Sequence, residues 1–248
     1  MSWTTQELMI AATAREIREG EVVFVGMRLP IMAFGAAKLT HAPEAVGLFE
    51  CGIVRDAPSK AMLYTMADPP NQLEAAWTAG LLPVMAHLPS GHVDAGFIGG
   101  AEIDRFGNIN TSCIGDFRHP KVRLPGSGGA ADIASMAKRT IAIMNHERRR
   151  LVERVSFITS PGFLDGRASR EALRLPGGPA AVITDRAVLR PHGPDGELHL
   201  HTLHPGESVE SVREHTGWNL QLHPELSETA PPTSAALHAL RHLDPDGF

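Results

Sequence analysis

Blocks of apolar residues, separated by polar and glycine-rich breaks, run along the chain and predict an α/β protein. Thr4 and Glu7 form a capping box ahead of apolar residues at helical spacing, so we expect a helix over 4–19. The segments that follow read as strand, helix and strand, at 21–26, about 31–40 and 47–50. This order predicts parallel strands joined by a helix that packs on the sheet.

The rest of the chain continues this alternation. Strand-like runs lie at 93–99, 141–144, 155–158, 181–184 and 197–203, and helix-like segments lie at 71–80, 130–138, 208–215 and 234–243. Turns are expected at Asp104–Gly107 and Pro191–Gly196, with a loop rich in glycine and proline over about 108–129. Because no repeat or low-complexity linker interrupts the chain, we expect a single domain over 1–248.

Composition narrows the function classes. The chain has 23 Lys+Arg and 28 Asp+Glu, and 5% of its residues are aromatic, so neither a basic face nor stacking platforms for nucleic acid are expected. Cys51 and Cys113 are the only cysteines and lack CxxC spacing, which excludes a disulfide framework and a cysteine-built zinc site. No uncharged apolar run has the length of a membrane span or the character of a secretory signal, so a cytoplasmic protein is expected.

Gly126–Ala130 is the densest glycine loop and leads into a predicted helix. Successive main-chain N–H groups there could bind an anion or an oxyanion. The preceding residues 121–125 are a poor strand, and no Gly-Lys-Ser/Thr ending follows, so the loop fits neither a dinucleotide nor a triphosphate fingerprint. A purely structural tight turn is the alternative that the residues leave open.

Glu50 ends an apolar strand at the carboxyl edge of the predicted parallel sheet, where ligands bind in such folds. A partly desolvated carboxylate at that place is a candidate nucleophile. The alternative is an acid that caps the next segment or pairs with Arg55. Cys51 beside it is a weaker candidate, because most semi-buried cysteines are inert packing.

Two polar clusters are open to more than one interpretation. His199 and His201 share a strand face and, with His204, form the most metal-like group. The flanking Glu197 and a turn fit a solvated outer face without a completing carboxylate pair, so no metal site is expected. The run His146–Arg150 could hold phosphates, although such charge runs usually form solvated helix faces.

Several segments closely resemble, in the same order, the β subunit of glutaconate CoA-transferase. They are Ile98–Asn110, Ile114–Lys121, Pro125–Ala131, Asn145–Arg150, Thr159–Gly166, Val182–Asp185 and His215–Trp218. Together they span nearly the whole chain and identify it as similar to class I CoA-transferases. The resemblance implies an open, mainly parallel α/β sheet flanked by helices, the CoA-transferase (NagB/RpiA-like) fold.

The resemblance also implies a mechanism. The family's nucleophile is a β-subunit glutamate in a Glu-Ser-Gly or Glu-Asn-Gly context, and the matching residue is Glu50, with Cys51 in the usual serine or asparagine position. It would carry CoA as a glutamyl thioester. The residues implied as oxyanion and CoA-loop donors are Asn110, Gly126, Gly128 and Gly129.

The implied partner is an α subunit that holds most of the CoA, in a heterodimer or a dimer of heterodimers. The substrates would be an acyl-CoA and a carboxylic acid, with no further cofactor, no metal, no nucleic acid and no membrane. Met27 and Arg28 stand where the glutaconate enzyme has smaller residues. If that loop lines the acyl pocket, Arg28 selects a carboxylate or fills space.

Two rival functions use the same scaffold. Some relatives are CoA-thioester decarboxylases or C–C hydrolases that have lost the family glutamate, so Glu50 favours transfer. The fold also serves as an effector domain in sugar-responsive repressors. No DNA-binding helix pair is expected before the first strand, because the chain already enters that strand after Gly20.

Overall fold

The computed structural model describes residues 2–59, 61, 63, 65–245 and 247, and the chain divides into two compact units. Unit 1 comprises residues 1–97 and 230–248, and unit 2 comprises residues 98–229. Compactness alone does not show whether the units unfold together, so the single domain over 1–248 stays a prediction. Among the described residues, no helix has the length and apolar character needed to cross a membrane.

The sheet of unit 1 has the strand order β5-β1-β2-β3-β4. The strands are β1 (Val22–Phe24), β2 (Val46–Phe49), β3 (Ile53–Arg55), β4 (Trp77–Thr78) and β5 (Ala95–Ile98), whose last residue opens unit 2. β1 pairs parallel with both β2 and β5, whereas β2, β3 and β4 pair antiparallel in turn. The expected strand–helix–strand unit is therefore confirmed, and antiparallel strands extend it on one side.

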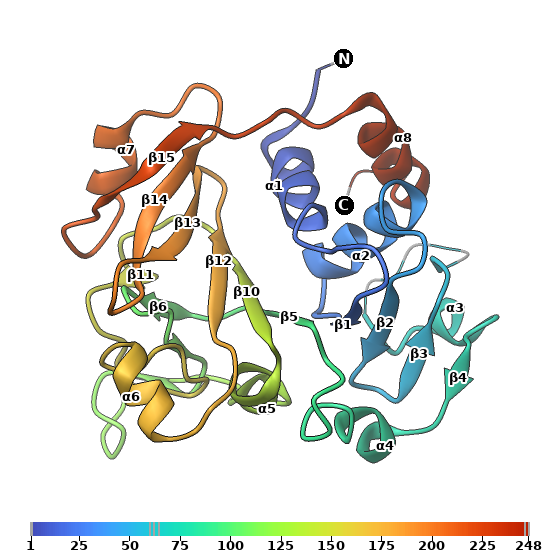
Figure 1. Ribbon diagram of the computed structural model, residues 1–248, viewed down its shortest axis with the longest axis horizontal. Helices are drawn as coiled ribbons and strands as arrows, with labels where there is room; N and C mark the ends of the chain where they lie inside the picture. Colours follow the sequence, from blue (N-terminus) through green and yellow to red (C-terminus); the bar gives the residue numbers. More distant parts are fainter. Residues whose placement is uncertain (1, 60, 62, 64, 246, 248) are drawn as a thin grey trace. The chain divides into compact units, whose positions relative to one another are not determined.

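Three helices of unit 1 pack against one another: α1 (Thr5–Ala14), α2 (Leu29–Leu39) and α8 (Ser234–Leu243) (Figure 1). Two glycines permit the close approaches of α2. A Cβ at Gly35 would lie 2.6 Å from a methyl of Leu243 on α8, and one at Gly47 of β2 would lie 2.6 Å from the Phe34 ring. The capping box predicted for α1 is present, since Thr4 Oγ1 accepts from the Glu7 N–H and Glu7 accepts from the Thr4 N–H.

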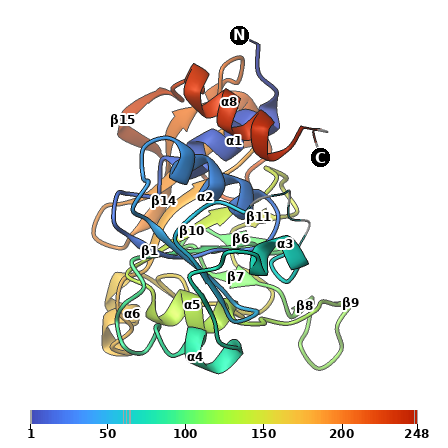
Figure 2. The ribbon, with the colours of Figure 1, turned by 90° about the vertical axis from the view of Figure 1, so that its right-hand side faces the viewer.

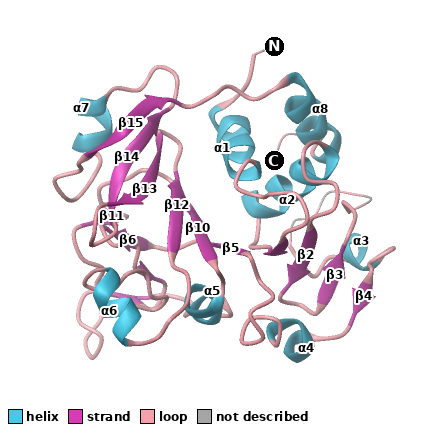
Figure 3. Ribbon diagram, in the orientation of Figure 1, coloured by secondary structure: helices cyan, strands magenta, loops and turns pink. Residues whose placement is uncertain are grey.

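The main sheet of unit 2 has the strand order β15-β14-β13-β12-β10 (Figure 3). The strands are β10 (Arg139–Ile143), β12 (Pro179–Ile183), β13 (Ala187–His192), β14 (Glu197–Leu203) and β15 (Leu222–Glu228). β10 with β12 and β14 with β15 pair parallel, whereas β12, β13 and β14 pair antiparallel. Because their apolar residues alternate or run continuously, β12 and β14 bury Val182, Leu198 and Leu200 completely or nearly so.

Smaller elements complete the two units. Unit 1 also contains α3 (Pro69–Gln72) and α4 (Leu81–Met85), and unit 2 contains α5 (Ala130–Met136), α6 (Arg167–Ala172) and α7 (Val209–Glu214). Five short strands form two small sheets: β6 (Glu102–Asp104), β7 (Ile109–Asn110) and β11 (Leu151–Val152) in one, β8 (Cys113–Ile114) and β9 (Val122–Arg123) in the other. The loop that joins β8 to β9 projects from the rest of unit 2 (Figure 2).

Several predicted elements are wrong or incomplete. The helix expected over 71–80 ends at Gln72, because the chain turns out at Leu73 and Trp77–Thr78 joins the edge of β3. No strand forms at 155–158, where the Ser156 N–H and hydroxyl bind Glu102 instead. The loop expected over 108–129 contains three short strands. β15 escaped prediction because its polar, largely exposed residues have no apolar periodicity.

His146 lies within a buried polar cluster of unit 2 rather than on a solvated helix face, and residues 146–150 form no helix. Its Nδ1 lies 3.0 Å from the Thr184 hydroxyl, and its Nε2 lies 2.9 Å from the Thr216 hydroxyl. Burial lowers the pKa of His146 to about 4, against the attraction of the Asp185 carboxylate. The neutral ring is therefore the form that the fold accommodates.

This burial predicts a pH-dependent stability. Because the folded pKa lies below the unfolded value of about 6.5, the unfolded chain binds more protons in acid, and stability is lost as pH falls from about 6.5 towards 4. The loss from this one group is about 3 kcal/mol. Urea unfolding at several pH values should show a smaller slope in this window for His146→Asn. The exposed-residue control His119→Asn should keep the wild-type slope, and equal slopes for both variants would contradict the assignment.

Candidate functional site

Glu50 and Cys51 form the tip of the hairpin that joins β2 to β3. The Gly52 N–H donates to the Phe49 carbonyl at 2.9 Å, and Phe49 pairs with Ile53, so Glu50 and Cys51 are the two central turn residues. The expected strand ends at Phe49, and Glu50 lies immediately beyond it, half-buried. The structure therefore places Glu50 at the carboxyl end of β2, as the sequence predicted.

Gly52 locks this turn against the chain before α4. Its φ of +99° favours glycine, and a Cβ there would lie 2.3 Å from main-chain atoms of Gly80. Its carbonyl accepts from the Ala79 N–H at 2.8 Å. Any side chain at this position would push the turn away from its support, so the absence of a side chain fixes where Glu50 points.

Cys51 is held as a thiol rather than activated. Its Sγ donates to the Met66 carbonyl at 3.1 Å. Burial raises the pKa of the Cys51 thiol, main-chain hydrogen bonds oppose this, and the neighbouring Glu50 charge raises it again. Because the thiolate is the nucleophilic form, this environment favours a positioning role in the turn.

Arg55 anchors the loop that faces the turn. Its guanidinium is 1% exposed and donates to the carbonyls of Ala57, Pro58, Asn71 and Leu73 at 2.7–3.0 Å. Its charge therefore holds main-chain oxygens of this loop in place, a role that does not require Glu50 as partner.

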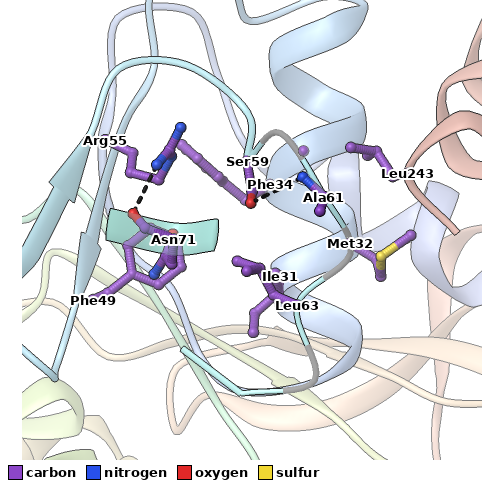
Figure 4. Close-up of a pocket in the computed structure, with 11 residues that line it drawn as sticks. Ile31, Met32, Phe34, Phe49, Arg55, Ser59, Ala61, Leu63, Asn71 and Leu243 are labelled. Carbon is purple, nitrogen blue, oxygen red and sulfur yellow. Dashed lines mark hydrogen bonds between the residues drawn. The ribbon is translucent and has the colours of Figure 1, made fainter. Parts of the chain in front are cut away.

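A small internal space lies beneath Phe49, between α2, α8 and this loop (Figure 4). Its volume is about 20 Å³, enough for a water molecule and far too small for an acyl-CoA. The residues that line it are Ile31, Met32, Phe34, Gly35, Phe49, Arg55, Ser59, Ala61, Leu63, Asn71 and Leu243. It is packing space behind the hairpin and not a substrate pocket.

Arg28 lies at the same edge of the unit 1 sheet as Glu50. It follows the carboxyl end of β1, which pairs parallel with β2 through Phe24 and Leu48, so both chain segments leave the sheet on one side. Arg28 is exposed and caps α2 with a φ of +64°, a conformation that strains a residue with a side chain. Such strain is typical of segments whose backbone is shaped for binding.

Asn110 is completely buried in β7, and its side-chain amide is fully engaged. The Nδ2 group donates to Glu102 at 2.7 Å and to the Cys113 carbonyl at 2.6 Å, while Oδ1 accepts from the Ser112 N–H at 2.9 Å. Both amide protons are thus used within the chain. The predicted oxyanion-donor role would require these bonds to be exchanged, and the geometry favours a role in positioning the loop.

The Gly126–Gly129 loop has the conformation that its glycines predict. Gly126 and Gly128 have φ values of +97° and +50°, and Gly129 is the first cap of α5. The Gly126 N–H donates to the Thr111 carbonyl at 2.8 Å, which places the loop beside the segment that follows Asn110. α5 has seven residues rather than the nine expected, so it contributes little dipole to the loop.

Sequence reasoning missed Glu102 and Ser156, which hold Asn110 in place. Glu102 is 6% exposed and accepts from Asn110 Nδ2 and from both the N–H and the hydroxyl of Ser156. The only local signal was the acid within the motif Ile98–Asn110. Ser156 lies in a segment that reads as a strand, and nothing local distinguishes it.

Known proteins resemble the chain along nearly its whole length. The family model described as Coenzyme A transferase matches residues 6–215. The B-type polypeptide of 3-oxoadipate CoA-transferase from Pseudomonas knackmussii is 41% identical over 98% of this chain and 94% of that protein. The B-type polypeptide of glutaconate CoA-transferase from Acidaminococcus fermentans is 33% identical over 98% of this chain and 94% of that protein.

Solved structures share the fold. Glutaconate CoA-transferase from Acidaminococcus fermentans superposes with a TM-score of 0.91 at 32% identity, over 98% of this chain and 96% of that chain. The decarboxylase AibA/AibB superposes with a TM-score of 0.87 at 27% identity, over 100% of this chain and 97% of that chain. The predicted α/β fold with parallel strands flanked by helices is confirmed.

The contact between Gly52 and Gly80 predicts a large difference between two glycine substitutions. Gly91→Ala meets open space at a φ of +73°, so it should cost only the strain of about 1–2 kcal/mol. Gly52→Ala should cost about 2 kcal/mol more, because the added methyl collides with main-chain atoms. Urea unfolding of the two variants measures this difference, and equal stabilities would show that the turn is not locked in this way.

Proposed function

Because the chain belongs to the coenzyme A transferase family, we propose that it is the β subunit of a heteromeric, cytoplasmic CoA-transferase. It moves CoA between an acyl-CoA and a dicarboxylic or oxo acid. The observation that carries this proposal is the position of Glu50, a half-buried carboxylate at the tip of the β2–β3 turn. The relatives are named as one of two lettered subunits, and this naming, with the two-part name AibA/AibB, supports an α-subunit partner.

Glu50 acts as a covalent carrier of CoA. One carboxylate oxygen attacks the carbonyl carbon of the acyl-CoA thioester, the carbon–sulfur bond breaks, and CoA leaves as a thiolate. The thiolate then attacks the glutamyl carbonyl of the mixed anhydride, which releases the first acid and leaves a glutamyl-CoA thioester. A second carboxylic acid reverses both steps and departs with CoA, so the thioester energy is conserved rather than lost to water.

Each tetrahedral intermediate carries an oxyanion that needs hydrogen-bond donors. We assign this role to main-chain N–H groups of the Gly126–Gly129 loop, whose left-handed glycines leave the backbone bare. Asn110 positions the neighbouring segment through Glu102 and Cys113 instead of donating directly. CoA itself is held largely by the α subunit.

Replacing the nucleophile tests the mechanism. In the complex of this chain with its α subunit, Glu50→Ala should lower kcat for transfer by at least about 10³-fold, because no other group can carry the CoA. With acyl-CoA alone, the wild-type complex should accumulate a covalent adduct whose mass equals CoA less one water. Mass spectrometry of the intact chain and of its peptides locates the adduct at Glu50.

The control is Glu44→Gln, an exposed acid of unit 1, which should retain wild-type activity and adduct formation. Borohydride or hydroxylamine added after acyl-CoA should inactivate the wild type and Glu44→Gln alike. Full transferase activity in Glu50→Ala would exclude the glutamyl-CoA mechanism.

A CoA-thioester decarboxylase or C–C hydrolase is the second candidate. It is favoured by the likeness to the decarboxylase AibA/AibB and by Cys51, which stands where the transferases usually have serine or asparagine. The retained Glu50 argues for transfer. Product analysis separates the two functions, since release of CO2, or of a cleaved acyl-CoA, in the absence of any acceptor acid would contradict the transferase proposal.

The exposed Arg28 predicts selectivity for an acceptor with a second carboxylate. Because a charge-assisted hydrogen bond contributes about 1.5–3 kcal/mol, Arg28→Gln should lower kcat/KM for dicarboxylic acceptors by about 10–100-fold, mainly through KM. Activity towards monocarboxylic acceptors should hardly change. Arg18→Gln, at another exposed arginine of unit 1, is the control, and an equal loss with both acceptor classes would exclude this role.

A further inference from the structure

Four histidines and a glutamate gather on one face of the β13-β14-β15 edge of the unit 2 sheet. This histidine cluster consists of His192, His199, His201, His223 and Glu225. Along β14 the side chains alternate, with Leu198 and Leu200 fully buried on one face and His199 and His201 half-buried on the other. The cluster therefore lies on the face opposite the apolar core of this sheet.

An irregularity in strand pairing assembles the cluster. β14 and β15 run parallel, with Leu200 opposite Leu222 but Thr202 opposite Ser227, so β15 advances five residues while β14 advances two. The additional residues of β15 include His223 and Glu225, and His201 lies opposite them on β14. The bulge thus carries an imidazole and a carboxylate to the exposed face beside His201.

The side chains of the cluster lie at distances that suit metal coordination. One ligand atom from each of His201, His223 and Glu225 lies within 4.8 Å of the other two. The His223 ring centroid lies 4.7 Å from those of both His201 and His192, and the His192 centroid lies 5.1 Å from that of His199. In the described part of the chain, the buried Nδ1 of His199 has no hydrogen-bond partner.

The cluster differs from the one that the sequence singled out. His204 is 3% exposed, and both of its ring nitrogens are engaged, Nδ1 with the Thr229 hydroxyl at 2.9 Å and Nε2 with the Thr184 carbonyl at 2.8 Å. It is a structural residue of the core. The groups that replace it, His223 and Glu225, lie about twenty residues further along the chain and meet His201 only through the β14–β15 pairing.

We propose that His201, His223 and Glu225 bind a divalent transition metal of the zinc class, with His192 adjacent to the site. Two imidazoles and one carboxylate match the nitrogen and oxygen ligands that Zn²⁺, Co²⁺ and Ni²⁺ accept, whereas Mg²⁺ and Ca²⁺ prefer all-oxygen sites. The metal ties the bulge of β15 to β14 and leaves the remaining coordination positions to water. The site is independent of the transfer reaction proposed for Glu50.

Metal titration of the chain without a polyhistidine tag tests the proposal. After treatment with a chelator and dialysis, calorimetry should show one equivalent of Zn²⁺, and Co²⁺ should give ligand-field absorption that Zn²⁺ abolishes and Mg²⁺ does not. His201→Gln, His223→Gln and Glu225→Gln should each weaken zinc binding by at least about tenfold. These three side chains are half-buried or exposed, so the variants should fold, and circular dichroism checks this.

The matched control is His238→Gln, which removes an exposed histidine of α8 and should leave zinc binding unchanged. Zinc should also raise the Tm of the wild type and of His238→Gln, but not that of the His201→Gln/His223→Gln double variant. A wild-type chain that binds no zinc, zinc binding that survives in the double variant, or an equal loss in His238→Gln would overturn the proposal.

Discussion

The parallel pairing of β1 with β2 is the constraint on which the candidate site depends. Because parallel strands end on the same side, the loop after Phe24 and the turn after Phe49 leave the unit 1 sheet at one edge. That edge receives Arg28 from one connection and Glu50 from the other. The contact of Gly52 with the Gly80 main chain then fixes the direction of the turn, so the carboxylate is oriented by backbone rather than by side-chain neighbours.

The polar residues of unit 2 show how a buried network limits chemistry. Asn110 satisfies Glu102 and the chain at Cys113, and each of these groups would carry a desolvation cost without its partner. A side chain used in this way is well positioned but has no donor left over. Main-chain N–H groups in a glycine loop are better suited to a developing oxyanion, since they need no side-chain rearrangement and lose no buried partner.

The edge of the unit 2 sheet combines two kinds of site-building. The face of β14 that bears Leu198 and Leu200 anchors the strand in the core, while the opposite face is free to carry polar groups. A bulge in β15 then adds residues whose side chains the regular register would have placed elsewhere. The same device, a local departure from regular backbone, shapes the Arg28 loop and the Glu50 turn in unit 1.

Local patterns in the sequence determined the helices with clear caps and the apolar strands: α8 and β14 have the predicted bounds, and Glu50 lies at the predicted strand end. Such features depend on residues within about one or two turns of chain, so periodicity and capping chemistry reveal them. Tertiary structure alone decided that Asn110 is occupied by Glu102, that Trp77–Thr78 pairs with β3, and that His201 meets His223. Strand register and the need to satisfy buried polar groups join residues far apart in the chain, and no local pattern records them.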